Sequence, residues 1–306
     1  MYFPYFRGRQ YELLALRELV NGKLIRNHVI PVVEPVKESS TFANAMEVFA
    51  KAEQRIGLVF NPTVGELSGE PKLSVPLCEL LNESLIPALI VNENMPEYLR
   101  ELESNDVIRS NLLTIMGNRD YIGIYNSEFS SSAPRFTLFS DDRQIRRTIK
   151  QGKVLFEDKF KKQRKNADYP EEEFFSEDHL YYTEEGYQGF GDYSVIGDEY
   201  TESGFAPYAV AIHIVYFADD NTLRIRHFVS DSNADVSDVA GKFHEAVTKL
   251  DTWYRNLPSK RTTTGLDTLL RHYKNETYPG LPTLKKLSVM HHLELVERFL
   301  SGETQA

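Results

Sequence analysis

Cysteine is almost absent from this 306-residue chain, whose single Cys78 excludes an intrachain disulfide and a zinc site built from cysteines. The sequence also lacks an 18-residue apolar run and a signal-peptide pattern, which predicts a cytoplasmic protein with no membrane span. Basic residues are outnumbered, 35 against 45 acidic, giving a formal net charge of −10. A broad basic surface for duplex DNA is therefore not expected, although a local basic patch stays open.

Several chemical motifs are missing as well. Residues 7–10 lack the Gly-x-Gly-x-x-Gly spacing, no phosphate-binding Gly-Lys-Ser/Thr loop occurs, and Ser194 has no Gly-x-Ser-x-Gly setting. The adjacent His291 and His292 would point about 100° apart on a helix, so they would not chelate one metal together. His213 lies among apolar residues of a strand, where a packing role is expected. The sequence predicts no cofactor and no metal site.

The first 38 residues carry the pattern that the rest of the chain repeats. An apolar segment at 2–6 precedes a helical pattern at 11–20, which stops at Asn21-Gly22 and leads to the apolar run 29–33. Such continuous apolar runs are typical of parallel strands that are buried on both faces. The stretch therefore predicts one βαβ unit, whose second strand ends at Glu34.

The same alternation continues to residue 159 and predicts an α/β protein with a TIM-barrel-like (β/α) barrel. A barrel of about eight strands fits the repeats better than a nucleotide-binding sheet, and we expect one barrel-like domain over 1–306. The expected helices lie at 41–54, 75–82, 96–103 and 142–150, and the expected strands at 56–60, 85–91, 112–116, 121–125, 135–139 and 154–156.

Residues 159–205 interrupt this rhythm with a segment rich in charge, Tyr and Gly. A stretch this long without clear periodicity is predicted to be a functional insertion or loop, and its aromatic residues favour order. After it, 208–217 and 223–229 predict a β-hairpin. Helices are expected at 236–255, 266–275 and 284–300, so that 256–306 forms a C-terminal helical segment.

Polar residues follow the predicted strands where a barrel places its chemistry. Arg7, Glu34, Asn61, Asn92 and Glu157 all lie at strand ends, and catalytic groups of such barrels come from the C-terminal ends of strands. Two acids with a base nearby could support general acid–base chemistry or glycoside cleavage. The strand ends of any soluble barrel are polar, however, so the same residues also have a purely architectural interpretation.

Charge pairing at this end carries a geometric prediction. We expect Arg7, Arg9 and Glu12 to converge with Glu34 around one end of the barrel, because they lie at a strand end, a helix start and the next strand end.

The 159–205 insertion offers two candidate surfaces. A basic run could touch nucleic acid, although such runs are commonly solvated faces; it comprises Lys159, Lys161, Lys162, Arg164 and Lys165. Aromatic residues could form a partner-binding surface, because Tyr and Phe are enriched in interface cores, or a lid packed over the protein's own barrel. The candidate partner-binding residues are Tyr169, Phe174, Phe175, Tyr181, Tyr182, Tyr187, Phe190, Asp192 and Tyr193.

Four segments resemble a known family: YFPYFRGRQYE at 2–12, ALREL at 15–19, IPVVEP at 30–35 and GFGDY at 189–193. They are similar to the Beta-protein-like group of phage and bacterial defence loci, and in particular to a bacterial family encoded beside a small restriction-nuclease-like partner. The resemblance implies a barrel-like protein of a defence locus that counteracts or controls a companion protein. It brings no catalytic residues with it.

Three hypotheses follow. The first is a non-catalytic or regulatory subunit that binds and controls a nuclease-like partner protein, encoded by the adjacent gene, in a two-gene, toxin–antitoxin-like antiphage module. The second is a barrel hydrolase that uses Glu34 and Glu157. The third is a nucleic-acid-binding subunit that uses the basic run. Under the first hypothesis, the chain could also contact nucleic acid indirectly, through its partner. The resemblance favours the first.

Overall fold

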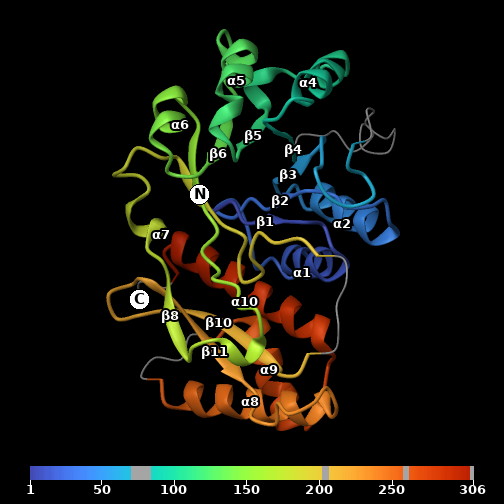
Figure 1. Ribbon diagram of the computed structural model, residues 1–306, viewed down its shortest axis with the longest axis vertical. Coiled ribbons are helices and arrows are strands. Elements are labelled where there is room, and N and C mark those ends of the chain that lie inside the picture. The colour runs from blue at the N-terminus through green and yellow to red at the C-terminus, as the bar shows by residue number, and fades with distance from the viewer. Residues whose placement is uncertain (70–83, 202–206, 258–261, 304–306) are drawn as a thin grey trace. The chain divides into compact units, whose positions relative to one another are not determined.

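A computed structural model describes residues 1–69, 84–201, 207–257 and 262–303 (Figure 1). The expected helix at 75–82 and Cys78 lie outside the described residues. The chain divides into two compact units. The first unit contains Met1–Asp158 and Asp178–Tyr193, and the second contains Lys159–Glu177 and Ser194–Ala306.

The first unit is built on an eight-stranded parallel sheet in the order β1-β2-β3-β4-β5-β6-β7-β9. Each strand pairs in parallel with the next, as in Val32 opposite Gly57 and Leu58 opposite Pro87. The strands are β1 Tyr5–Phe6, β2 Val32–Val33, β3 Ile56–Val59, β4 Leu85–Ile90, β5 Leu113–Met116, β6 Phe136–Phe139, β7 Lys153–Phe156 and β9 Gly189–Gly191.

The last strand returns to the first. The backbone N–H of Phe3 donates to the Phe190 carbonyl at 2.8 Å, and that of Tyr5 donates to the Asp192 carbonyl at 2.8 Å. Tyr2 and Phe190 also form a parallel bridge. The sheet is therefore a nearly closed barrel of the TIM-barrel type, and the predicted fold class is confirmed.

Glycine permits this closure. A Cβ atom on Gly189 would lie 2.6 Å from Cε2 of Phe3 and 2.7 Å from the Met1 carbonyl oxygen. On Gly191 it would collide with the Phe3 carbonyl oxygen. Residues 189–191 are thus the last strand of the barrel rather than part of a loop, and the seam between β9 and β1 requires glycine at positions 189 and 191.

Helices lie around the outside of the strands of this unit (Figure 1). Two of them begin at side-chain caps: before α2, the Ser39 hydroxyl accepts from the Phe42 N–H at 3.2 Å, and before α6, the Asp142 carboxylate accepts from the Gln144 N–H at 2.7 Å. The helices are α1 Gln10–Asn21, α2 Ser40–Lys51, α4 Met95–Ser104, α5 Ile122–Phe129, α6 Arg143–Thr148 and the short α7 Asp178–Tyr181.

One expected strand is wrong, because residues 121–125 are helical. The Asn118 side chain accepts from the Asp120 N–H at 2.9 Å and starts a 3₁₀ turn, Arg119–Tyr121, that continues into α5. A short apolar run has no periodicity that separates a strand from a buried helix turn. The other expected strands that end at or before residue 156 lie in the barrel.

The barrel interior is filled by side chains from alternate strand positions. Tyr5, Val32, Ala88, Leu113 and Ile115 belong to one buried cluster across adjacent strands. Aromatic rings complete it, with Phe3 and Phe136 5.0 Å apart between ring centroids. The interior is thus a packed core, as expected for a barrel of eight strands.

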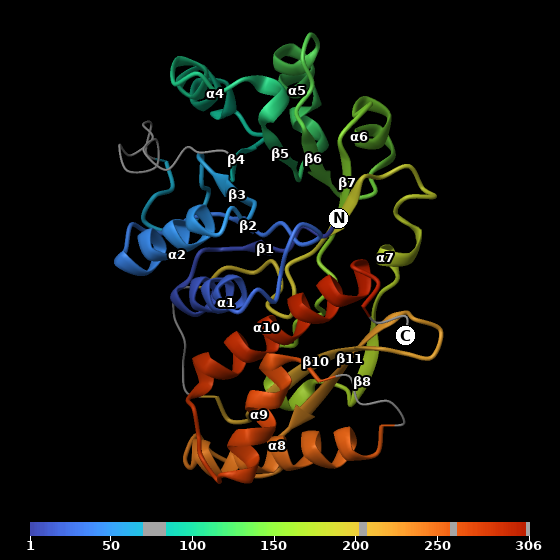
Figure 2. The ribbon, with the colours of Figure 1, turned by 180° about the vertical axis from the view of Figure 1, so that it is seen from behind.

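The second unit contains a three-stranded antiparallel sheet in the order β10-β11-β8 (Figure 2). The expected hairpin and all three expected C-terminal helices are confirmed. The elements are β8 Glu172–Ser176, β10 Ala211–Phe217, β11 Leu223–Val229, α8 Val239–Arg255, α9 Thr264–Lys274 and α10 Leu281–Leu300. Among the described helices of the chain, none is long and apolar enough to cross a membrane.

The expected insertion at 159–205 contains more regular structure than its sequence indicates. Its strand β8 joins the sheet of the second unit, whereas β9 is the eighth strand of the barrel. The tract Gly189-Phe190-Gly191 has low intrinsic strand preference, so no strand was expected there. Residues 202–205 lie outside the described part. One domain over 1–306 stays a prediction.

Candidate functional site

Glu34 is the central residue of the predicted site at the C-terminal ends of the barrel strands. Its side chain is fully buried, and both carboxylate oxygens are occupied. Oε2 accepts from the Tyr5 hydroxyl at 2.7 Å and from the Arg7 guanidinium. Oε1 accepts from the Thr63 N–H at 2.6 Å and the Thr63 hydroxyl at 2.9 Å. Glu34 therefore links β1, β2 and the loop after β3.

Arg7 is held between aromatic rings. Its guanidinium carbon lies 5.3 Å from the Tyr5 ring centroid and 5.6 Å from that of Tyr193. Burial is the largest influence and opposes the charge, but Glu34, Tyr5 and Tyr193 together outweigh it and raise the pKa of Arg7. Burial, together with Glu34, also raises the pKa of Tyr5 well above its ordinary value, so its hydroxyl stays a donor. The predicted pairing of Arg7 with Glu34 is confirmed.

Arg9 and Glu12 meet at the start of α1. The backbone N–H of Arg9 donates to Oε2 of Glu12 at 3.2 Å, which closes the first turn of the helix. Their convergence on Glu34 stays a prediction.

The two asparagines at strand ends have structural partners. Nδ2 of the buried Asn61 donates to the Ile90 carbonyl at 2.7 Å, while its Oδ1 accepts from the Ile90 N–H at 2.8 Å. Oδ1 of Asn92 accepts from the Met95 N–H at 3.0 Å, at the start of α4. Asn61 thus ties the ends of β3 and β4 together, and Asn92 fixes the helix that follows β4.

Glu157 occupies a different part of the same barrel end. It follows β7, which is separated from β2 by β9 and β1 around the barrel. Its partly buried carboxylate accepts from the Asp141 N–H at 3.4 Å. The two acids of the hydrolase hypothesis therefore lie three strands apart, and Glu34 is engaged by donors of its own.

The candidate partner-binding residues differ in exposure. Phe174 and Tyr181 are exposed, with 42% and 45% of their surface accessible. Tyr169, Tyr182 and Tyr193 are partly buried. The remaining four are buried in the protein's own packing: Phe175, Tyr187, Phe190 and Asp192.

Two of these buried residues have defined roles in the barrel unit. The Asp192 carboxylate accepts from the Tyr2 hydroxyl at 2.7 Å, and the Phe190 ring stacks on Tyr2 with centroids 5.1 Å apart. The aromatic segment thus also supplies the core of this unit.

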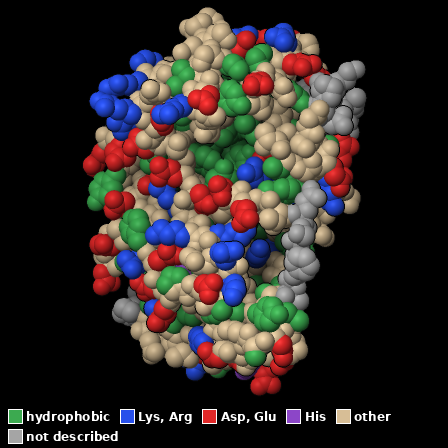
Figure 3. All heavy atoms as spheres, viewed as in Figure 1, with side chains coloured by type: hydrophobic (Ala, Val, Ile, Leu, Met, Phe, Trp, Pro, Cys, Tyr) green, Lys and Arg blue, Asp and Glu red, His purple; other side chains and the backbone are tan. Residues whose placement is uncertain are grey.

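The basic run is partly neutralised by the second unit itself. Lys161 pairs with Glu173 at 3.4 Å, and Lys162 pairs with Glu199 at 2.7 Å. Arg164 and Lys165 are exposed, and Lys159 is partly buried. These two ion pairs suit a solvated surface better than a phosphate-binding track. The face drawn in Figure 3 intermixes basic and acidic side chains.

A histidine pair in the second unit was not foreseen. His213 of β10 lies opposite His227 of β11, with their Nδ1 atoms 2.7 Å apart, and Nε2 of His227 lies 3.3 Å from Oε1 of Glu173. The rings of Phe160 and Tyr169 pack on the pair, at 5.1 Å and 4.6 Å from His213. The pair fastens residues from 159–177 onto the hairpin.

The hairpin turn contained the signal for this pair. Phe217 pairs with Leu223 next to the turn. His213 and His227 each lie four residues farther from the turn along their strands, so this register places them opposite each other. A carboxylate–imidazole–imidazole chain can pass a proton, but here aromatic rings cover it.

Ser194 also meets a histidine. Its hydroxyl lies 2.9 Å from Nδ1 of His292, and Ser194 has a positive φ of 52°. Both side chains are fully buried, which suits an internal hydrogen bond better than a nucleophile that must reach a substrate.

No family model, curated protein or solved structure matches the chain significantly. Within residues 1–69, 84–201, 207–257 and 262–303, no group of three His, Cys, Asp or Glu side chains is arranged to hold a metal ion. The site is therefore interpreted from its own geometry.

Proposed function

We propose that this chain is a non-catalytic interaction subunit that binds and controls a nuclease-like partner protein in the cytoplasm. The partner would be encoded by the adjacent gene, and the pair would act as a two-gene antiphage module. The resemblance to the Beta-protein-like group motivates the identity of the partner and the defence role.

The state of Glu34 is the observation that supports a non-catalytic role. A general base needs a lone pair directed at the proton it removes. All four hydrogen bonds to Glu34 come from the protein, two to each oxygen. Such a carboxylate is a structural cross-link.

The exposed residue Phe174 supports a partner surface on β8. Among the described strands, β8 pairs only with β11, so it is an edge strand of this sheet. Edge strands with exposed aromatic side chains are suited to receive a strand or loop of another protein. Large aromatic residues also dominate interface energies.

Co-purification with the product of the adjacent gene tests the proposal. We expect the tagged wild-type chain to retain the partner and Phe174→Asp to lose it, because a carboxylate would be desolvated in the interface. Tyr208→Asp is the matched control, since Tyr208 is an exposed aromatic residue of the same unit. Absence of any complex between the wild-type proteins would refute the proposed function. Retention of the partner by Phe174→Asp would exclude the β8 surface.

A further inference from the structure

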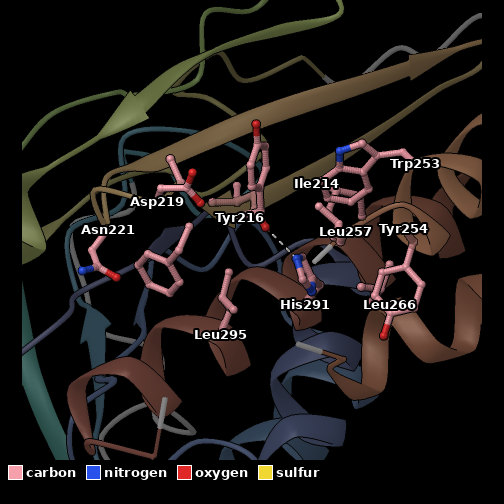
Figure 4. Close-up of a pocket in the computed structure, with 13 residues that line it drawn as sticks. Ile214, Tyr216, Asp219, Asn221, Trp253, Tyr254, Leu257, Leu266, His291 and Leu295 are labelled. Atoms are coloured by element: carbon pink, nitrogen blue, oxygen red, sulfur yellow. Dashed lines mark hydrogen bonds between the residues drawn. The ribbon is translucent and has the colours of Figure 1, made fainter. Parts of the chain in front are cut away.

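A cavity of about 300 Å³ lies within the second unit, along β10 and the turn that follows it (Figure 4). This volume is at the lower end of the range for small-molecule sites. The cavity is lined by Ile214, Val215, Tyr216, Phe217, Ala218, Asp219, Asn221, Trp253, Tyr254, Leu257, Leu266, His291 and Leu295.

Aromatic rings that line the cavity pack against other rings of the second unit. Trp253 of α8 packs edge-on against Tyr216, with ring centroids 5.1 Å apart, and against Phe228 at 5.5 Å. Phe217 stacks on Phe299 at 4.7 Å. Rings held in this way form a preorganised apolar surface, which reduces the entropy cost of binding.

His291 contributes shape without charge. One ring nitrogen, Nε2, donates to the Val215 carbonyl at 2.7 Å, the bond drawn in Figure 4, so Nδ1 accepts from the Thr263 hydroxyl at 2.7 Å. Both nitrogens are thereby used. Burial lowers the pKa of His291 to about 4, so the imidazole is neutral near pH 7 and does not repel a cation.

Charge is supplied by one carboxylate at the rim. Asp219 and Asp220 are adjacent in the turn, but they are used differently. Asp220 accepts from the Thr222 N–H at 2.9 Å and the Thr222 hydroxyl at 2.7 Å, and so holds the turn. Asp219 lines the cavity and has no hydrogen bond or ion pair with the described residues. In Figure 4, Asp219 and Trp253 lie on the two sides of the cavity.

We propose that this cavity binds a small organic cation, with an apolar body among the aromatic rings and an ammonium group at Asp219. The aromatic rings offer apolar contact to the body of such a ligand, and the unpaired carboxylate of Asp219 attracts its ammonium group. The proposal concerns a ligand site separate from the partner surface.

Trp253 gives a direct measurement, because it is the only tryptophan of the chain. Its emission is followed in the full-length protein at pH 7 while one of three probes with the same phenyl ring is added. Phenethylamine carries a positive charge, 2-phenylethanol is neutral and 3-phenylpropionate is negative. We expect phenethylamine to bind about two- to fivefold more tightly than the alcohol, and the carboxylate most weakly.

Three variants separate charge from shape. Asp219→Asn should bring the affinity for the amine down to that for the alcohol, whereas Asp220→Asn, which removes the same charge one residue away, should keep most of the preference. Leu295→Phe should fill the cavity and weaken all three probes. Circular dichroism confirms folding of each variant, and Leu257→Phe replaces Leu295→Phe if the latter fails to fold.

Four results would overturn the proposal. These are no response of Trp253 to any probe, equal affinity for the amine and the alcohol, tightest binding of the carboxylate, and unchanged amine binding in the folded cavity-filling variant. The expected order of affinities, together with its loss in Asp219→Asn, supports it.

Discussion

Nδ1 of His213 lies 2.7 Å from Nδ1 of His227, directly across the hairpin. Because ionised Glu173 can only accept, Nε2 of His227 donates to it, and the neutral His227 then accepts from Nδ1–H of His213. One proton therefore occupies the short contact between the two rings. If both imidazoles were protonated, each Nδ1 would carry a hydrogen, and two N–H donors would face each other across this contact.

This relationship predicts that neither imidazole titrates in its ordinary range. Burial, with additional effects of His227 and Lys285, lowers the pKa of His213 well below its ordinary value. Burial also lowers the pKa of His227, although Glu173 opposes it. In a titration followed by NMR, both ring signals should stay unchanged from pH 8 to pH 6. A midpoint near 6.5 for either residue of the pair would contradict this tautomer assignment.

The His291 site predicts loss of stability in acid. The unfolded imidazole has a pKa near 6.5, and burial lowers the folded value to about 4. The unfolded state therefore binds more protons below pH 6.5, so the stabilisation is complete above that pH and is lost as the pH falls toward 4. The loss should reach about 3 kcal/mol for this group. Urea unfolding followed by Trp253 emission measures it, and His291→Gln should flatten the slope.

Glu34 and Glu157 should respond differently to the same substitution. Glu34→Gln leaves the partly buried Arg7 without its charged partner, so we expect a loss of about 3 kcal/mol in the free energy of unfolding. Glu157→Gln should cost less than about 1 kcal/mol, because its carboxylate is partly exposed. Chemical denaturation of the two variants checks both values.

Phage protection by the same variants distinguishes a subunit from a hydrolase. A folded Glu157→Gln chain should protect as well as the wild type, whereas a hydrolase that uses Glu157 as acid or base would lose about 100- to 10,000-fold in rate. Loss of protection with partner binding intact would favour the hydrolase hypothesis.

The barrel seam predicts a severe effect of one methyl group. Gly191→Ala would place Cβ against the Phe3 carbonyl oxygen, which is backbone and cannot rotate away. We expect a loss of about 2–4 kcal/mol in the thermal or chemical unfolding of the chain. Gly123→Ala is the control, because that position in α5 has open space around it and alanine favours helices. If the Gly191→Ala and Gly123→Ala variants had equal free energies of unfolding, the backbone at the seam would have shifted to accommodate the methyl group.

Strand ends could be predicted from the sequence because apolar runs mark them. The apolar runs 2–6 and 29–33 predict two parallel buried strands. Arg7 and Glu34 follow these strands directly, so both could be placed at the same end of the barrel. The two hydrogen bonds from Thr63 to Glu34 could not be predicted, because a loop conformation such as that after β3 produces no periodic pattern in the sequence. Likewise, the use of Asp220 and not Asp219 in the hairpin turn depends on side-chain orientation.

The eighth strand shows a different limit. Nothing in the composition of Gly189-Phe190-Gly191 favours a strand, and its glycines become necessary only when Phe3 lies beside them. A feature imposed by residues more than 180 positions away cannot be recognised from its own neighbourhood.

The distance between β1 and β9 along the chain has a consequence for biosynthesis. The ribosome must add the residues from Tyr5 to Gly191 before the barrel can close, which takes about 10–40 s at ordinary rates of elongation. During that time the edges of β1 and β7 have no neighbour from β9, and unpaired edges invite pairing with other chains. Newly made protein should therefore need protection from aggregation until its last barrel strand leaves the ribosome.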